Sequence, residues 1–118
     1  QRPQELLLLR AAHLLDAPKP PTAIVAANDL LAFGCLSSIA DLGLACPSDV
    51  SVVGFNDIIS PDRLAPALPT VPFSPPDLGR RAAELLLRRL DEPAIAPELV
   101  VLETSLVLRK STAPPRTD

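Results

Sequence analysis

The apolar positions between residues 21 and 57 follow two different periods. Residues 23–27 and residues 51–55 are short apolar runs bounded by proline or polar residues, which is typical of buried strands. Residues 29–42 instead repeat apolar side chains at helical spacing. A crossover of this kind makes its two strands parallel and is almost always right-handed. We therefore predict an α/β fold built on a Rossmann-like parallel sheet flanked by helices.

Each predicted strand ends in a polar pair, Asn28-Asp29 after the first and Asn56-Asp57 after the second. The carboxyl ends of neighbouring parallel strands meet at one edge of the sheet, where open α/β sheets bind small ligands. An asparagine amide offers two donors and one acceptor oxygen, so two of them suit a neutral ligand with hydroxyl or amide-like groups. We therefore take Asn28 and Asn56, with Asp29 beside them, as candidate ligand-binding residues.

The two aspartates of these pairs allow a second interpretation, acid–base or Mg²⁺ chemistry at the same edge. A structural role competes with it, because Asp29 falls in the positive first turn of the predicted helix and Asp57 opens a turn. The one histidine, His13, lies in an apolar helix, and the sequence has neither a zinc-type Cys/His spacing nor a glycine-rich phosphate loop. The pattern favours a binding protein over an enzyme and predicts no cofactor and no metal.

Two more helices are predicted outside this unit. Residues 4–16 lack proline and glycine and carry leucines on nearly every face, so this helix needs cover from more than one side. The sequence Ser74-Pro75-Pro76-Asp77 is a strong helix start, with serine as N-cap and proline at the first helical position. That helix is expected to reach about Asp91. Its apolar stripe is formed by Leu78, Ala82, Leu85, Leu86 and Leu90.

The remaining segments are predicted to be loops and short strands. Residues 58–69 are broken by prolines and are expected to form a loop or a short edge segment. Residues 98–103 and residues 105–109 have the apolar character of short strands. Residues 111–118 are expected to be a loose tail.

The composition narrows the partners and the compartment. The chain has 118 residues and a net charge of −3, and it lacks the basic patch of a nucleic-acid-binding surface. No apolar stretch approaches the length of a membrane span, and no signal peptide is recognisable. The two cysteines, Cys35 and Cys46, are interpreted as reduced thiols. These features predict a cytoplasmic protein with no membrane partner.

A second apolar face on the predicted helix 29–42 indicates a dimer. The face that we expect to cover the sheet is formed by Leu31, Ala32, Cys35, Leu36, Ile39 and Leu42. The opposite face carries Leu30, Phe33 and Ser37, where a solvated helix would carry Lys and Glu. Scattered exposed apolar residues are the simpler explanation. We expect instead a two-fold, self-complementary interface with Phe33 at its centre.

Several motifs of this chain occur in the order found in one known family. They are residues 21–34 (Pro-Thr-Ala-Ile-Val-Ala-Ala-Asn-Asp-Leu-Leu-Ala-Phe-Gly), 43–44 with 47–57, 68–71, 78–83 and 105–112. Through these motifs the chain resembles the LacI/GalR family of bacterial transcriptional regulators.

The resemblance implies a periplasmic-binding-protein-like effector domain with two α/β lobes, of which this chain is the incomplete C-terminal portion. In that family a sugar, nucleobase, nucleoside or similar effector binds between the lobes. Binding changes the affinity of a separate N-terminal helix-turn-helix, absent from this chain, for operator DNA. By analogy, residues 1–72 would form the C-terminal lobe. Residues 73–104 would form a crossover and a segment packed with the N-terminal lobe, and residues 105–118 a final strand and tail.

The resemblance also assigns roles to single positions. Asn28 matches a family residue that hydrogen-bonds the effector, and Asn56 stands where many members carry an aspartate that contacts sugar hydroxyls. Phe73 stands where glutamine is common, which makes it a further ligand-binding candidate. Leu64 falls where the family makes dimer contacts, so it joins Leu30, Phe33 and Ser37 as an expected interface residue.

Three functions remain open at this point. The first is the effector-binding and dimerisation portion of a LacI-type repressor that senses a sugar or similar small metabolite, and the closing strand 105–112 favours it. The alternative is a periplasmic sugar-binding protein of an ABC transporter, which has the same fold. A full reading frame with an N-terminal helix-turn-helix would support the first, and a secretion signal the second. An enzyme that uses Asp29 and Asp57 is a weaker third hypothesis.

Overall fold

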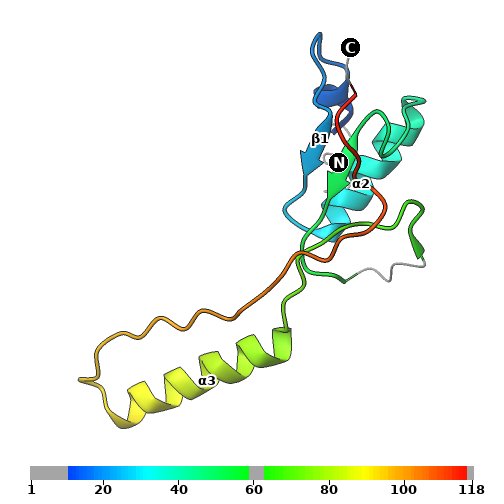
Figure 1. Cartoon of the computed structure of the whole chain (residues 1–118). Coiled ribbons are helices and arrows are strands. Elements are labelled where there is room, and N and C mark those ends of the chain that lie inside the picture. Colours follow the sequence, from blue (N-terminus) through cyan, green and yellow to red (C-terminus); the bar gives the residue numbers. More distant parts are fainter. Residues whose placement is uncertain (1–10, 59–62, 117–118) are drawn as a thin grey trace. The chain divides into compact units, whose positions relative to one another are not determined.

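The computed structural model describes residues 11–58 and 63–116 (Figure 1). The chain divides into two compact units, and we describe each by itself. The first unit comprises residues 1–72 together with residues 106–118, and the second unit comprises residues 73–105. The three-part division implied by the resemblance stays a prediction for the complete protein. In this chain the C-terminal residues 106–118 group with residues 1–72.

The first unit contains the strand–helix–strand motif expected from the sequence. Strand β1 (Ala23–Val25) leads through helix α2 (Asp29–Asp41) to strand β2 (Ser51–Val53). The strands are parallel, with Ala23 opposite Ser51 and Val25 opposite Val53. Both strands are shorter than predicted, because regular pairing ends at Val25 in β1 and at Val53 in β2. The fold prediction of a parallel sheet with helices is confirmed.

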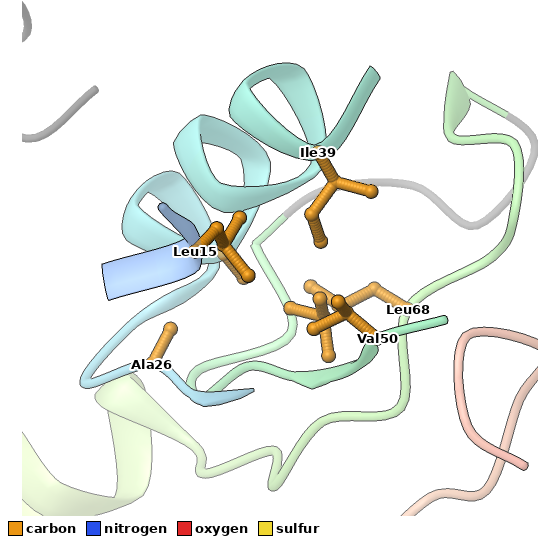
Figure 2. Close-up of a cluster of buried hydrophobic side chains, with 7 residues drawn as sticks. Leu15, Ala26, Ile39, Val50 and Leu68 are labelled. Carbon is orange, nitrogen blue, oxygen red and sulfur yellow. The ribbon is translucent and has the colours of Figure 1, made fainter. Parts of the chain in front are cut away.

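The hydrophobic core lies between α2 and the two-stranded sheet. Helix α2 covers one face of β1 and β2, and residues 11–15, which are also helical, bring Leu15 to the same core (Figure 2). Each large aliphatic side chain buried in this way stabilises the fold by roughly 1.5–3 kcal/mol. The buried cluster is formed by Leu15, Ala26, Ala32, Ile39, Val50, Val52 and Leu68.

Helix α2 presents to the core nearly the face predicted for it. Ala32 and Ile39 are fully buried, while Leu31, Cys35 and Leu36 are partly buried against the same cluster. The prediction for Leu42 was wrong. It is the C-cap of α2 and 44% exposed, because the helix ends there and Gly43 turns the chain with a left-handed φ of 70°.

Two further segments extend the sheet without forming regular strands. Residues 69–71 run beside the end of β2, where Gly54 N–H donates to Pro69 O at 2.9 Å. Thr70 and Val107 form an antiparallel bridge, so the predicted strand 105–109 is reduced to a single pairing. The prediction that residues 111–118 form a loose tail is wrong at residue 111. Ser111 is fully buried and its hydroxyl donates to Val52 O at 2.7 Å, which fixes residue 111 against β2.

The second unit is dominated by helix α3 (Pro75–Asp91). Ser74 is its N-cap and accepts a hydrogen bond from Asp77 N–H, as the sequence predicts. No residue of α3 is buried. Residues 98–103, predicted as a strand, have no regular secondary structure. No other part of the described chain hydrogen-bonds to them as a neighbouring strand.

Candidate functional site

The two polar pairs predicted at the sheet edge lie side by side in the first unit. Asp29 N–H donates to Phe55 O at 2.9 Å, which ties the chain after β1 to the chain after β2. Asn28 and Asn56 are each the immediate neighbour of one of these two bonded residues. The structure therefore brings both asparagines to the same carboxyl edge. Their contact with a ligand stays a prediction.

The side chain of Asn28 has one structural role, which uses its amide oxygen and leaves its amide nitrogen unused. Its backbone is extended, and its side-chain oxygen accepts a hydrogen bond from Leu31 N–H at 2.9 Å as the N-cap of α2. Within the described residues, no partner is found for its amide nitrogen. Asn28 is half-buried, so the two N–H donors of its amide are available at the edge.

Asn56 and Asp57 form a left-handed turn at the end of β2. Their φ angles are 100° and 54°, a region that non-glycine residues seldom adopt and that Asn and Asp tolerate best. Asn56 N–H donates to Val71 O at 3.0 Å, and Asp57 N–H donates to Thr70 Oγ1 at 3.2 Å. These bonds fix the backbone of the turn, and the half-buried Asn56 side chain extends from it.

The prediction that Asp29 contacts a ligand needs correction. Its side chain is 1% exposed, and its carboxylate accepts hydrogen bonds from Thr70 Oγ1 and from Ile58 N–H, both at 2.8 Å. The room for this carboxylate depends on Gly54. A Cβ at that position would overlap Asp29 Oδ1 and would lie 2.7 Å from Leu68 Cδ2. Asp29 is therefore an internal support of the edge and does not face its surface.

An ion pair that the sequence did not predict completes the edge. Arg109 Nη1 lies 2.7 Å from Asp57 Oδ1, with the two side chains 14% and 28% exposed. The same nitrogen donates to Leu68 O at 2.8 Å. A single arginine in an apolar segment was the available signal. In the sequence, Arg109 and Asp57 are separated by the loop after β2 and by the second unit, and no spacing rule links residues so far apart.

This arrangement does not favour the hypothesis that Asp29 and Asp57 carry out acid–base or metal chemistry. Asp29 and Asp57 are engaged by internal partners. Burial raises the pKa of the Cys35 thiol and of the Cys46 thiol, which is the opposite of activation as nucleophiles. Across residues 11–58 and 63–116, no group of three or more His, Cys, Asp or Glu could hold a metal ion.

Phe73 belongs to the second unit, where it is half-buried. Its predicted role at the edge therefore stays a prediction. In the first unit Phe55 is 40% exposed and directly precedes Asn56. It supplies an apolar surface at the edge, next to the candidate ligand-binding residue Asn56.

The predicted dimer face of α2 is open in this chain. Leu30 is 63% exposed and Phe33 is 51% exposed. Ser37 is half-buried and its hydroxyl donates to Phe33 O at 3.1 Å. Leu64 is half-buried and packs against the core cluster. The arrangement is compatible with an interface, and its existence stays a prediction.

Residues 1–112 match the family model of the periplasmic-binding-protein-like domain. The chain belongs to this family. Within it, the chain is similar to regulators of the LacI/GalR type, as the resemblance of its motifs implied. It is 37% identical over 98 residues to the HTH-type transcriptional repressor PurR of Histophilus somni, a match that covers 83% of this chain and 29% of that protein.

The chain is also similar to solved structures of LacI-type regulators. A LacI family transcriptional regulator from Enterococcus faecium with bound ribose is 32% identical, with a TM-score of 0.78 over 98% of this chain and 42% of that one. The dimeric Lac repressor with an 11-residue C-terminal deletion is 30% identical, with a TM-score of 0.79 over 96% of this chain and 41% of that one. The match to PurR spans less than a third of the length of that relative.

One further finding concerns membranes. Within the described part of the chain, no helix combines the length and the apolar character that crossing a bilayer requires.

Proposed function

We propose that this chain is the effector-binding and dimerisation portion of a LacI-type transcriptional repressor that senses a sugar or a similar small metabolite. The observation that carries the proposal is the edge itself. Asn28 and Asn56, half-buried, flank the bond from Asp29 N–H to Phe55 O, and the amide nitrogen of Asn28 faces no competing partner in the described chain. The similarity to a ribose-bound regulator supports it.

The chemistry of the edge favours a neutral, hydroxyl-rich ligand. The amide donors and acceptors of the two asparagines can bind sugar hydroxyls or the edge of a base, and the exposed part of Phe55 offers an apolar surface for a flat ring. The internal carboxylate of Asp29 is not offered to the ligand. Neutral sugars and nucleosides should therefore bind better than cationic compounds.

The regulator is favoured over the solute-binding protein of an ABC transporter. The PurR relative and the two solved structures described above are all transcriptional regulators. On this proposal the complete protein acts in the cytoplasm, is not an enzyme, and contacts operator DNA through an N-terminal helix-turn-helix. Residues 1–118 alone, with a net charge of −3, should not bind operator DNA in a low-salt gel shift.

The effector site is tested by a thermal-shift screen of sugars, nucleosides and sugar phosphates on the complete effector domain, followed by calorimetry of the compound that binds. Asn28→Ala would remove the helix cap as well as the ligand donor, so Asn28→Ser is the sharper variant, because serine is also a favoured N-cap but lacks the amide group. Asn28→Ser should weaken binding roughly tenfold, since a buried hydrogen bond to the ligand is lost. Unchanged affinity would contradict the assignment of Asn28.

Dimerisation is proposed through the exposed face of α2. Leu30 and Phe33 form its exposed apolar centre, and an aromatic anchor is a common feature of such interfaces. Phe33→Asp would place a charge there and should give monomers at micromolar concentration in light scattering. Ser48→Asp adds the same charge at an exposed turn position and should leave the dimer intact. A dimeric Phe33→Asp variant would place the interface elsewhere.

A further inference from the structure

Residues 107–113, which we call the closing segment, tie together two parts of the first unit. Val107 and Thr70 exchange backbone hydrogen bonds of 2.9 and 3.2 Å. Further along, Val52 N–H donates to Ser111 O at 2.8 Å, and the Ser111 hydroxyl donates to Val52 O at 2.7 Å. The closing segment thus joins β2 to residues 67–70, and it lies far along the sequence from both.

Arg109 carries the contact between the closing segment and the carboxyl edge. Its Nη1 atom lies 2.8 Å from Leu68 O and 2.7 Å from Asp57 Oδ1. The Arg109 side chain is only 14% exposed, so this pair is less screened by water than an ordinary surface ion pair. One guanidinium group therefore connects the loop before residue 70 with the turn after β2.

The turn that Arg109 reaches requires support from outside. Asn56 and Asp57 both have positive φ, a conformation that costs free energy for residues other than glycine and persists when surrounding contacts determine it. The backbone contacts are Asp57 N–H to Thr70 Oγ1 and Ile58 N–H to Asp29 Oδ2. The side-chain contact is the ion pair with Arg109.

We propose that Arg109 is a positioning residue for the effector site. It holds Asp57, and through Asp57 it holds the left-handed turn that presents the Asn56 amide at the edge. The part of this inference that concerns the effector rests on the proposed function. The part that concerns the turn stands on the contacts alone, and the two can be tested separately.

The turn is tested in the complete protein by hydrogen exchange of the Asp57 and Ile58 amides. Arg109→Met removes the guanidinium group and keeps an unbranched apolar stem. The matched control is Arg116→Met, which breaks an exposed ion pair with Asp49 of 3.3 Å in the same C-terminal stretch. Exchange of the two amides should be about tenfold faster in Arg109→Met and unchanged in Arg116→Met. Arg109→Lys, which keeps the charge, should restore part of the protection. Equal exchange in Arg109→Met and the unaltered protein would overturn the proposal.

The effector part is tested by calorimetry with D-ribose and adenosine as probes. Arg109→Met and Asp57→Asn should each weaken binding about tenfold, and the double variant should bind no more weakly than either single one, because both remove the same contact. Additive losses would contradict a role through Asp57.

Asn56→Gly removes the amide and keeps a residue that tolerates the positive φ of the turn, so it separates failure of this inference from failure of the proposed function. If Arg109→Met speeds exchange while Asn56→Gly binds as the unaltered protein does, the positioning of the turn is supported and the effector role of Asn56 fails. If Asn56→Gly weakens binding while Arg109→Met alters neither exchange nor affinity, the effector site stands and the positioning proposal is overturned. If neither probe binds, the exchange result decides the positioning of the turn.

Discussion

The two units of this chain owe their structure to different kinds of interaction. The first unit has a buried core and a network of polar contacts between residues distant in sequence, such as Thr70 with Asp29 and Arg109 with Asp57. Within the described residues, the second unit has helix α3 as its one helix, and none of the 17 residues of α3 is buried. The contrast teaches that signals within a few residues are enough to build α3, whereas the first unit, which carries the candidate site, depends on long-range contacts.

Helix α3 shows how far local chemistry extends. Ser74 caps its N-terminus, and Arg80 pairs with both Asp77 and Glu84 at 3.0 Å. Exposed pairs of this kind contribute little to stability, because water and salt screen the two charges. Leu86 and Leu90 remain 60% and 67% exposed. On the proposed function, we expect the N-terminal lobe of the complete effector domain to cover this apolar stripe.

The largest expected effect of a single change concerns the buried carboxylate of the first unit. Asp29→Ala leaves Thr70 Oγ1 and Ile58 N–H without their acceptor and should destabilise the first unit by about 3 kcal/mol or more. Urea unfolding followed by circular dichroism measures the loss. Asp41→Ala, at the exposed end of α2, should change stability by less than about 0.5 kcal/mol. Equal effects of the two variants would show that the network around Asp29 is not structural.

Replacing a glycine by alanine should change stability in opposite directions in the two units. Gly54→Ala places a Cβ onto Asp29 Oδ1 and should destabilise by about 1–3 kcal/mol. Gly79→Ala meets nothing within 4 Å and should stabilise α3 by about 0.5–1 kcal/mol, because alanine has the higher helix propensity. Thermal unfolding gives the first value, and the helical chemical shifts of residues 75–91 report the second. A stabilising Gly54→Ala would contradict the close packing at the edge.

The smallest expected effect is the pH dependence of α3. Hydrogen bonds from Ser74 and Arg80 lower the pKa of Asp77, and a hydrogen bond from Arg80 lowers the pKa of Glu84. A depressed carboxyl pKa contributes stability above its ordinary value, and this contribution is lost as the pH falls through the depressed value. Helical chemical shifts of residues 75–91 should therefore decline below about pH 4, and less so at high salt. If the helicity of α3 instead rises as the pH falls, the prediction is contradicted.

The sequence predicted what depends on local patterns. The strand–helix–strand unit and the start of α3 at Ser74 follow from periodicity and capping residues within a few positions. The shared edge of Asn28 and Asn56 followed from one topological rule for parallel strands.

The features that the sequence did not predict depend on contacts across the fold. Burial of Asp29 requires Gly54 and Thr70 to meet beside it, and the ion pair of Asp57 requires Arg109 to return from the C-terminal stretch. Ser111 was expected in a loose tail because nothing near it in sequence indicates Val52 as its partner. Burial and pairing of polar groups are set by tertiary structure, and no local period encodes them.

The central claim is that the carboxyl edge of the first unit binds the effector. The most direct measurement is amide hydrogen exchange of the complete protein, with and without the compound that gives the largest thermal shift in the screen. The account predicts slower exchange at residues 27–29 and 55–58 when the compound is bound, and no slowing at residues 48–50. Tight binding that leaves exchange at residues 27–29 and 55–58 unchanged would contradict the claim.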